Sequence, residues 1–246
     1  MTTAAGLNTT DPADRHALVV AAGDVPPRAV LDAAWPGWDE TIVDVIAADG
    51  GLVRARALGL RPDIMVGDLD SIAPALLAAA EADGIPVRRA RTDKDESDAE
   101  LALLEALARG ATRITVLGAF GGPRLDHALA NVWLLAHPAL RAADVILLDA
   151  GARAFLVQAP GPGGGPLTRA LPGAIGATVT LLPFGGDVTG VSTRGLAYAL
   201  RDEPLVVGPA RGLSNVRDSA DAAVTIRSGR LLIVETSPPA ALSSNA

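Results

Sequence analysis

The stretch Pro62-Asp-Ile-Met-Val-Gly-Asp-Leu-Asp-Ser71 decides the fold class, because it joins a short apolar run to an acidic loop that precedes a helix start. Residues 64–66 are apolar and are followed by Gly67, which is typical of a short buried strand that ends in a turn. Residues 74–82 begin with proline and are rich in alanine and leucine, a composition that favours a helix. A strand followed at once by a helix predicts one unit of a parallel sheet.

The same alternation extends through the first 149 residues. Apolar runs predict strands at residues 17–21, 44–48, 64–66, 86–88, 113–117 and 145–148. Alanine- and leucine-rich stretches predict helices at residues 52–58, 74–82, 98–108 and 125–136. Residues 15–149 are therefore expected to form an α/β domain around a parallel sheet.

The chain changes character after residue 149. Segment 160–166 reads PGPGGGP, which predicts a loop because proline lacks an N–H donor and glycine is entropically costly to order. Short runs bounded by glycine and aspartate predict strands at residues 177–182, 196–200, 204–207, 222–226 and 231–236. We expect an all-β domain over residues 150–236 and a flexible tail over residues 237–246.

Charge and composition exclude several classes of function. The 246-residue chain has a net charge of −7, which argues against a nucleic-acid or anionic-membrane partner. It contains no cysteine, so a disulfide, a thiolate metal site and a cysteine nucleophile are excluded. Residues 1–14 lack the pattern of a signal peptide, and no apolar run approaches the roughly 20 residues of a membrane helix. We expect a cytoplasmic protein.

Two aspartates follow the strand predicted at residues 64–66. Asp68 and Asp70 are spaced i, i+2, so in an extended loop both side chains project to the same side. Paired carboxylates repel each other unless a cation lies between them, and their hard oxygen atoms suit Mg²⁺. A turn with a helix cap supplied by Asp70 or Ser71 is an equal alternative for this motif taken alone.

A second acidic cluster follows the next predicted strand and favours the metal site over the turn with a helix cap. It comprises Asp93, Lys94, Asp95 and Asp98. Ser97 and Glu100 form a capping box, which places Asp98 at the first helical position. An exposed acidic helix start accounts for Asp98 and Glu100 but not for the three charged residues before them. A lysine among carboxylates suits a phosphate group that carries a metal, so the two clusters together favour metal binding.

A glycine-rich turn follows the strand predicted at residues 113–117. Gly121 and Gly122 belong to a turn that can present backbone N–H groups to an anion. On the next helix one polar face carries Arg124, His127 and Asn131, and the predicted apolar face carries Leu125, Leu129 and Val132. A single histidine would more often be a solvated surface residue, but here an arginine and an asparagine share its face.

The segment Asp49-Gly-Gly51 after residues 44–48 repeats this pattern more weakly, with a tight turn as the equal alternative. No P-loop, G-x-S-x-G or H-E-x-x-H motif occurs in the sequence. The residues by themselves therefore predict Mg²⁺-assisted transfer that involves a phosphorylated ligand such as a nucleotide, without naming the acceptor.

Seven short motifs, taken in order, resemble those of the thiamine pyrophosphokinase family. They are Asp49-Gly-Gly, Gly67-Asp-Leu-Asp-Ser71, Asp93-Lys-Asp-Glu-Ser-Asp98, Arg124-Leu-Asp-His127 with Asn131, Leu182-Pro-Phe-Gly185, Gly195-Leu-Ala-Tyr198 and Ser214-Asn215. The resemblance implies a Rossmann-like parallel-sheet domain followed by a C-terminal β-sandwich, in a homodimer whose thiamine sites use both subunits. It also implies transfer of the pyrophosphoryl group of ATP to the thiamine hydroxyl, with release of AMP.

The resemblance also implies roles for individual residues. Asp68, Asp70 and Asp98 would hold Mg²⁺ on the triphosphate, and Asp49 would lie near the acceptor. The nucleotide and its phosphates would be surrounded by Asp93, Lys94, Asp95, Gly121, Gly122, Arg124, Asp126, His127 and Asn131. Thiamine would be bound by Tyr198, Ser214 and Asn215, with ordinary strand packing as the near-equal alternative for Tyr198.

Two other functions fit the same residues. One is a diphosphokinase for another small alcohol such as a pterin, because the motifs of the second domain are weaker. The other is a noncatalytic protein that binds a nucleotide or thiamine, since a fold by itself does not prove activity.

Overall fold

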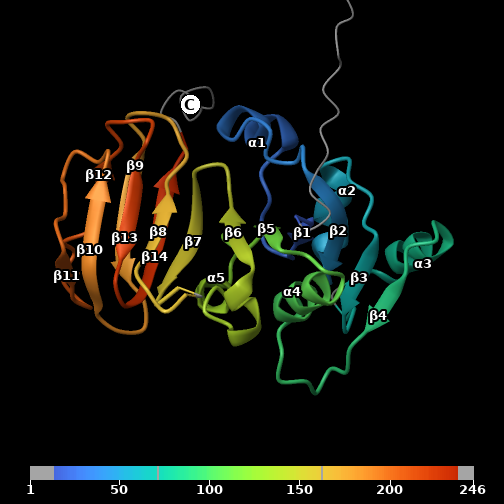
Figure 1. Ribbon diagram of the computed structural model, residues 1–246. Helices are drawn as coiled ribbons and strands as arrows, with labels where there is room; N and C mark the ends of the chain where they lie inside the picture. Colours follow the sequence, from blue (N-terminus) through green and yellow to red (C-terminus); the bar gives the residue numbers. More distant parts are fainter. Residues whose placement is uncertain (1–13, 71, 162, 238–246) are drawn as a thin grey trace, which may run out of the picture.

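A mixed sheet of ten strands runs through the whole molecule, in the order β12-β9-β14-β7-β6-β5-β1-β2-β3-β4 (Figure 1). The structure is a computed structural model, and it describes residues 14–70, 72–161 and 163–237. The strands β1 to β6 pair parallel with one another in this sheet. The strands β7, β9, β12 and β14 pair antiparallel with their neighbours. The predicted combination of a parallel α/β part and an antiparallel part is confirmed.

The first part of the chain alternates strands and helices. Its strands are β1 (His16–Val20), β2 (Ile42–Ala48), β3 (Ile64–Gly67), β4 (Val87–Arg89), β5 (Arg113–Leu117) and β6 (Asp144–Leu148). Its helices are α1 (Arg28–Ala34), α2 (Gly51–Ala57), α3 (Pro74–Ala82), α4 (Asp98–Ala108) and α5 (Leu125–Leu134), followed by the 3₁₀ helix η1 (Pro138–Ala142). The sequence did not predict α1 or η1, which are short, and α1 begins without a side-chain cap.

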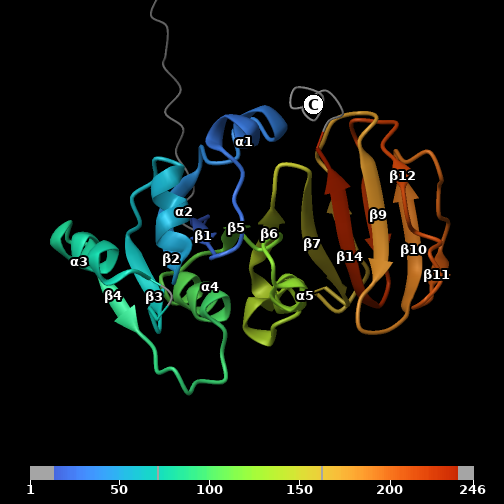
Figure 2. The same cartoon turned by 180° about the vertical axis from the view of Figure 1, so that it is seen from behind.

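Helices cover both faces of the parallel strands, because alternate strand residues point to opposite sides. Ile114 and Val116 of β5 belong to the same core cluster as Leu103 of α4. Leu117 belongs to a second cluster with Leu31 of α1. Figure 2 shows this part of the molecule from behind. No helix in the described ranges is long and apolar enough to cross a membrane.

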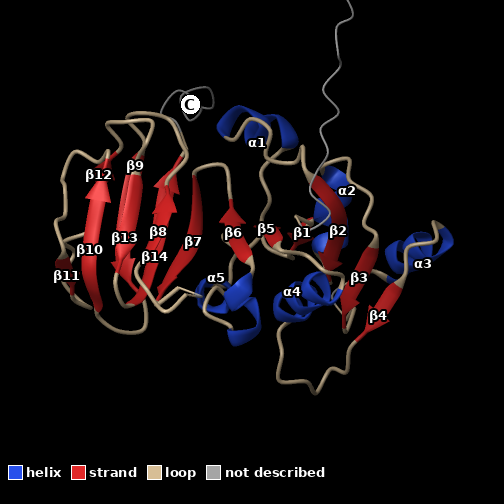
Figure 3. Cartoon of the chain, viewed as in Figure 1, coloured by secondary structure: helices blue, strands red, loops and turns tan. Residues whose placement is uncertain are grey.

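The second part of the chain contains only strands among its described residues (Figure 3). They are β7 (Ala152–Ala159), β8 (Leu167–Ala170), β9 (Thr178–Pro183), β10 (Val188–Arg194), β11 (Glu203–Leu205), β12 (Asn215–Val216), β13 (Ala223–Ile226) and β14 (Gly229–Thr236). Four of them continue the large sheet, and the other four form a separate sheet in the order β11-β10-β13-β8. Side chains from both sheets, such as Leu181, Ile233 and Ile226, share one buried core cluster.

The large sheet continues across the predicted domain boundary at residues 149 and 150. β6 and β7 pair antiparallel, with Ile146 opposite Phe155. The boundary itself stays a prediction, but strand pairing makes the two parts mechanically continuous.

Two predictions for the second part are wrong. Residues 196–200 do not form a strand, because Gly195 has a φ of +64° and only Leu196 makes an isolated bridge. The backbone N–H groups of Tyr198 and Leu200 donate instead to side-chain oxygens of Asn215 and Thr193. The strand predicted at residues 204–207 is the shorter β11, and β7, β8, β10 and β12 were not predicted.

The first residue of the predicted flexible tail, Ser237, is part of the fold. Ser237 is buried, and its N–H donates to the carbonyl of Gly151. The rest of that segment, residues 238–246, lies outside the described residues.

Buried His16 should make the stability of the fold depend on pH. Its ring nitrogens lie 2.8 Å from Thr41 Oγ1 and 2.9 Å from Thr115 Oγ1. Burial, followed by the nearby Arg113, lowers the pKa of His16 from 6.5 to about 4. A lowered pKa in the folded state means that the unfolded chain takes up the proton first. The contribution of neutral His16 is therefore complete above pH 6.5 and is lost as the pH falls towards 4.

We expect the His16→Gln variant to lose less unfolding free energy than the parent chain when the pH falls from 6.5 to 4. The difference should reach at most about 3 kcal/mol, from a shift of two to three pKa units. Urea unfolding at several pH values measures it. The matched control is His127→Gln, which makes the same replacement at an exposed histidine. Parallel profiles for the parent and His16→Gln would contradict the prediction.

Candidate active site

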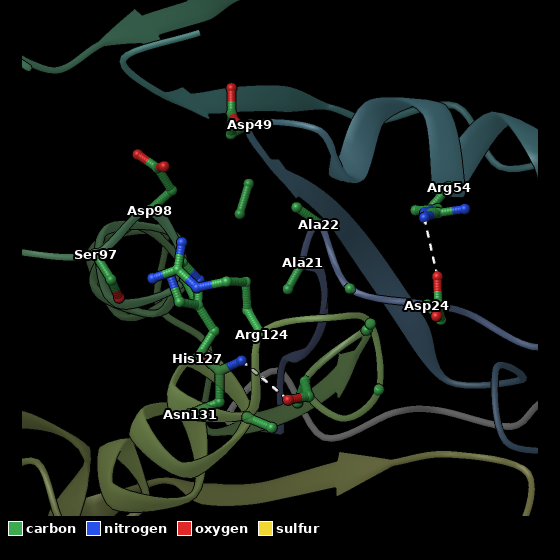
Figure 4. Close-up of a pocket in the computed structure, with 18 of the residues that line it drawn as sticks. Ala21, Ala22, Asp24, Asp49, Arg54, Ser97, Asp98, Arg124, His127 and Asn131 are labelled. Atoms are coloured by element: carbon green, nitrogen blue, oxygen red, sulfur yellow. Dashed lines mark hydrogen bonds and ion pairs between the residues drawn. The ribbon is translucent and has the colours of Figure 1, made fainter. Parts of the chain in front are cut away.

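A cleft of about 670 Å³ lies along the carboxyl ends of the parallel strands. The segments that line it follow β1, β2, β3, β4 and β5, and the helix α5 closes one side (Figure 4). In an open parallel sheet this edge is where ligands bind, near the point where successive connections diverge. Here that point lies between β1 and β5, since β2 to β4 extend the sheet to one side and β6 to the other.

Three carboxylates meet in this cleft. Asp49, Asp68 and Asp70 each offer an oxygen atom within 4.8 Å of the other two. Asp49 follows β2, is buried and adopts a φ of +47°, while Asp68 and Asp70 follow β3. Converging carboxylate oxygens of this kind suit a hard divalent cation. The structure thus brings Asp49, which sequence reasoning placed near the acceptor, into the same group as two of the predicted metal ligands.

Lys94 lies between the two predicted acidic clusters. Its Nζ is 2.9 Å from Asp68 Oδ2 and 2.8 Å from Asp98 Oδ1, and its side chain is only 11% exposed. The hydrogen bond from Lys94 is the main cause that lowers the pKa of Asp68. Burial acts to lower the pKa of Lys94, but the hydrogen bonds to Asp98 and Asp68 outweigh it and raise that pKa. Lys94 and Asp68 therefore both stay charged at neutral pH.

The chain contains no other lysine, since its remaining basic side chains are arginines apart from the three histidines. A lysine presents a compact point charge that can turn between acceptors, whereas arginine has a rigid planar fork. The ammonium group of Lys94 is thus placed to neutralise carboxylates in the absence of a ligand and to reach an anion when one is bound.

Asp98 is held in place by its helix and by a glycine. Ser97 caps α4, because the N–H of Glu100 donates to Ser97 Oγ at 3.1 Å, and Asp98 is the first helical residue, as predicted. A Cβ atom on Gly67 would lie 3.0 Å from Asp98 Oδ1 and 3.2 Å from Cβ of Asp49. Gly67 therefore leaves room for the two carboxylates to flank the end of β3. Asp70 does not cap α3, whose N-cap is Ala73, and Ser71 lies outside the described residues.

The helix α5 contributes the basic side of the cleft. Arg124, His127 and Asn131 all line it, as the predicted polar face requires (Figure 4). Asn131 Nδ2 donates to the carbonyl of Ala119 at 3.0 Å, which ties α5 to the loop after β5. In that loop Gly121 and Gly122 have φ values of +77° and +82°. Two successive left-handed residues form a tight turn beside the cleft that backbone N–H groups can line.

The predicted apolar face of α5 is not buried. Leu125 is 71% and Leu129 is 54% exposed, and Trp133 on the same stripe is 56% exposed. Val132 alone of the three predicted residues packs partly against the core. The prediction was wrong because α5 turns Val132 and Leu134 towards the core on its face of the sheet, and Leu125 and Leu129 away from it.

Several predicted residues lie outside the cleft lining. Asp93 pairs with Arg91, at 2.8 Å between Oδ1 and Nε, and Asp95 is exposed. Asp126 is exposed and pairs with Arg124, which holds the pKa of the Asp126 carboxyl well below its usual range. Arg124 therefore reaches the cleft already paired with a carboxylate.

Sequence reasoning missed one charged pair in the cleft. Arg54 of α2 lies 3.1 Å from Asp24, which follows β1, and both line the cleft (Figure 4). The signal was present, because the small residues Ala22 and Gly23 follow a strand that ends at the same edge as β2 and β3. An acidic residue directly after them was therefore a candidate for the same cleft.

The residues predicted to bind thiamine lie at the other end of the molecule. Tyr198 and Asn215 line a hollow of about 290 Å³. The nearby strands β10, β11 and β12 lie at the end of the molecule opposite β3 and β4 (Figures 1 and 2). Buried Asn215 fixes the backbone of Tyr198 through two hydrogen bonds of 3.0 Å and 2.7 Å, and the Tyr198 side chain is 70% exposed. Ser214 has a φ of +57° and donates its N–H to Thr180 Oγ1. Tyr198 is thus not packed into the core, contrary to the alternative of ordinary strand packing.

Two models of one protein family match this chain, one in each part. The family model "Thiamin pyrophosphokinase, catalytic domain" matches residues 38–147, and "Thiamin pyrophosphokinase, vitamin B1 binding domain" matches residues 170–233. A curated relative, the thiamine pyrophosphokinase of Bacillus subtilis, is 25% identical over 191 residues, which are 78% of this chain and 86% of that protein.

Solved structures show the same fold. The thiamine pyrophosphokinase of Bacillus subtilis superposes with a TM-score of 0.76 at 24% identity, covering 91% of this chain and 99% of that one. The yeast thiamin pyrophosphokinase superposes with a TM-score of 0.73 at 15% identity, covering 97% and 90% of the two chains. Since both domain models of one family match this chain in order and cover most of it, the chain belongs to the thiamin pyrophosphokinase family.

Proposed function

We propose that this protein transfers the pyrophosphoryl group of ATP to the hydroxyl of thiamine, giving thiamine diphosphate and AMP. This function rests on one observation, made in a chain that belongs to the family. In the cleft of this chain, three carboxylates face an arginine and a glycine-rich turn. Oxygen ligands for a cation on one side and anion-binding groups on the other match the two needs of a metal-bound triphosphate.

Mg²⁺ fits the donor set of the cleft, which consists of carboxylate oxygens without histidine or sulfur ligands. Asp68 and Asp70 would hold it with Asp49, and a bound Mg²⁺ would neutralise charge on the phosphate oxygens. Asp98, the third predicted ligand, is engaged by Lys94. A triphosphate offers Lys94 a second set of oxygen atoms, which would release Asp98 towards the metal.

The phosphates and nucleotide would lie between the acidic group and α5. Gly121 and Gly122 would present backbone N–H groups, while Arg124 and His127 would reach the phosphates from the first turn of α5. Asn131 would act by fixing the loop after β5. Asp93, Asp95 and Asp126 are outside the cleft lining and would act at its rim. Asp93 would do so through Arg91 and Asp126 through Arg124.

A homodimer would bring the two half-sites together. In one chain the described residues that line the acidic cleft differ from those that line the Tyr198 hollow. The cleft follows β1 to β5 and the hollow lies near β9 and β12, which are on opposite sides of the large sheet (Figure 1). Each end also exposes apolar side chains: Leu125, Leu129 and Trp133 beside the cleft, and Val206, Val207 and Leu213 with Tyr198 at the other end. Such patches on a soluble protein mark interaction surfaces. Residues 15–149 would then act as the nucleotide-binding domain, and residues 150–236 as a thiamine-binding β-sandwich.

Replacement of Tyr198 tests the shared site. We expect Tyr198→Ala to lower kcat/KM for thiamine about 10-fold, through loss of a stacking surface worth roughly 1.4 kcal/mol, with unchanged KM for ATP. Steady-state kinetics with each substrate varied in turn measures both constants. Leu76→Ala, another exposed apolar residue, is the matched control and should behave as the parent.

Mixing variants separates a shared site from a site within one chain. Tyr198→Ala and Asp70→Asn subunits, unfolded and refolded together, would give heterodimers that contain one intact site. A random mixture should reach about a quarter of the parent rate at low thiamine concentration. A rate equal to the mean of the two variants alone would contradict the shared site and leave the activity itself unaffected.

The function is tested by incubating the protein with ATP, Mg²⁺ and thiamine and quantifying the products. We expect AMP and thiamine diphosphate in equal amounts. AMP release with a pterin alcohol but not with thiamine would assign a different acceptor. Tight ATP binding without AMP formation would show a noncatalytic protein, and formation of ADP would show transfer of a single phosphoryl group.

A further inference from the structure

A second groove, of about 650 Å³, lies on the face of β5 and β6 opposite α4 and α5. Trp35 and Trp38, which follow α1, form one wall, and Pro172 to Ala174 between β8 and β9 form the other. Its floor comes from residues of β1, β5, β6, β7 and β14. It shares no lining residue with the acidic cleft.

The groove carries an excess of positive charge in a chain that is acidic overall. Its lining includes four arginines and two carboxylates, namely Arg113, Arg153, Arg169, Arg217, Asp144 and Glu235. Arg169 is neutralised by Asp144, with both carboxylate oxygens at 2.8 Å. Glu235 is shared by Arg153, at 2.6 Å, and by Arg217. One carboxylate between two guanidinium groups leaves a positive charge uncompensated at this point.

Arg217 is the most unusual of these side chains. It is 0% exposed, and its Nε and Nη1 have no hydrogen-bond partner among the residues that the structure describes. Unmet donors on a buried charged group are costly, because each has lost its water without gaining an acceptor. The wall segment lies directly on the guanidinium, since a Cβ atom on Gly173 would be 2.9 Å from Arg217 Nη2. The Arg217 guanidinium, with two unmet donors, therefore lies directly behind the segment that contains Gly173. A larger residue than glycine at position 173 would press on it.

An aromatic surface adjoins this charge. The indole of Trp35 is fixed by a 2.7 Å hydrogen bond from Nε1 to the carbonyl of Asp149. The guanidinium of Arg153 lies 5.1 Å from the centre of the Trp35 ring. A flat apolar surface beside a cation suits a ligand that has an apolar body and an anionic end.

We propose that this groove binds a small organic oxyanion, a carboxylate or a phosphate monoester. Its charged oxygens lie beside Arg153, the more exposed member of the pair, and its flat or apolar body lies against Trp35, while the positive charge of buried Arg217 attracts the anion from behind the Gly173 segment. The anion supplies the second negative charge that Glu235 alone does not provide. The inference is independent of the transfer reaction, because no residue of the groove belongs to the acidic cleft or to the Tyr198 hollow.

The indole N–H signals of the protein labelled with ¹⁵N-tryptophan test the proposal. The chain has three tryptophans, of which Trp35 and Trp38 line the groove, while Trp133 lies on α5 and serves as an internal reference. Benzoate and phenyl phosphate are the probes, and neutral benzamide is the matched control ligand. We expect a saturable shift of the Trp35 signal with at least one of the two anions and none with benzamide. The stronger of the two identifies the preferred oxyanion. No saturable shift with either anion, or an equal shift with benzamide, would overturn the proposal.

Two variants connect that shift to the guanidinium. Arg217→Met should weaken binding of the probe at least 10-fold, and Gly173→Ala should weaken it by crowding Arg217 while the charge is kept. Gly173→Ala also guards against loss of folding in Arg217→Met, whose replaced side chain is fully buried. Arg56→Gln, at an exposed ion pair with Asp83, is the matched control and should bind as the parent. Unchanged affinity in folded Gly173→Ala and Arg217→Met would assign the shift to another site and reject the proposal.

Discussion

The Asp70→Asn variant should lose about 1,000-fold in kcat while keeping the thermal stability of the parent chain. The carboxylate of Asp70 is exposed and converges with those of Asp49 and Asp68, so its loss removes a cation ligand rather than a packing contact. Removing one ligand of a catalytic metal costs several kcal/mol of transition-state stabilisation, and about 4 kcal/mol corresponds to that factor. The rate of AMP formation at several Mg²⁺ concentrations measures the effect.

The matched control is Asp83→Asn, an exposed aspartate at the end of α3 that pairs with Arg56. It should keep the parent kcat, because it lies outside the cleft. Calorimetric titration with Mg²⁺ in the presence of a nonhydrolysable ATP analogue adds a readout that does not depend on turnover, and only Asp70→Asn should weaken that binding. A parent-like rate for Asp70→Asn at saturating Mg²⁺ would remove Asp70 from the metal site.

The Gly51→Ala variant should show the largest loss of stability. Gly51 begins α2 directly after Asp49 and Gly50, and a Cβ atom there would lie 1.8 Å from the carbonyl oxygen of Val20 in β1. The obstacle is the backbone of a central strand, which cannot rotate away as a side chain could. Overpacking in a well-packed region costs about 1–3 kcal/mol, and a backbone clash this close should cost at least the upper value. For a chain of this size that loss lowers Tm by roughly 6–12 °C.

Gly186→Ala is the matched control for this substitution, because a Cβ atom on Gly186 would meet no atom within 4 Å. Calorimetric melting of both variants and the parent measures the difference. We also expect folded Gly51→Ala to lose activity, since the movement of α2 away from β1 would displace Asp49. A Tm within 2 °C of the parent would show that β1 and α2 can separate without cost, and would contradict the packing argument.

Local patterns predicted the acidic half of the site well. The loops after residues 48 and 67 and the start of α4 were all recognised, because a strand followed by small or acidic residues has a local signature. The Ser97 cap of α4 follows from its own sequence, and so does the first-turn position of Asp98. These local patterns could not predict which side chains from different loops lie close together. The ion pairs of Lys94 with Asp68 and Asp98 depend on how β3, β4 and α4 pack, and no local rule contains that information.

The errors share a physical cause. Leu125 and Leu129 have the helical spacing of a buried face, yet α5 packs on the core through Val132 and Leu134 and leaves them exposed. Residues 196–200 have the composition of a strand, but hydrogen bonds to Asn215 and Thr193 hold them in another conformation. Periodicity states which residues can be buried together, and only the neighbouring elements decide whether they are.

The sequence by itself determined the alternation of strands and helices up to residue 149, the all-strand character that follows, and the acidic loops at the strand ends. These features depend on neighbours within a few residues, where propensity, capping and turn chemistry act. Only the tertiary structure decided that Asp49 joins Asp68 and Asp70, that Lys94 bridges both clusters, and that the Tyr198 hollow lies far from them in one chain. Those relations depend on contacts between residues distant in sequence, which sheet order and packing fix.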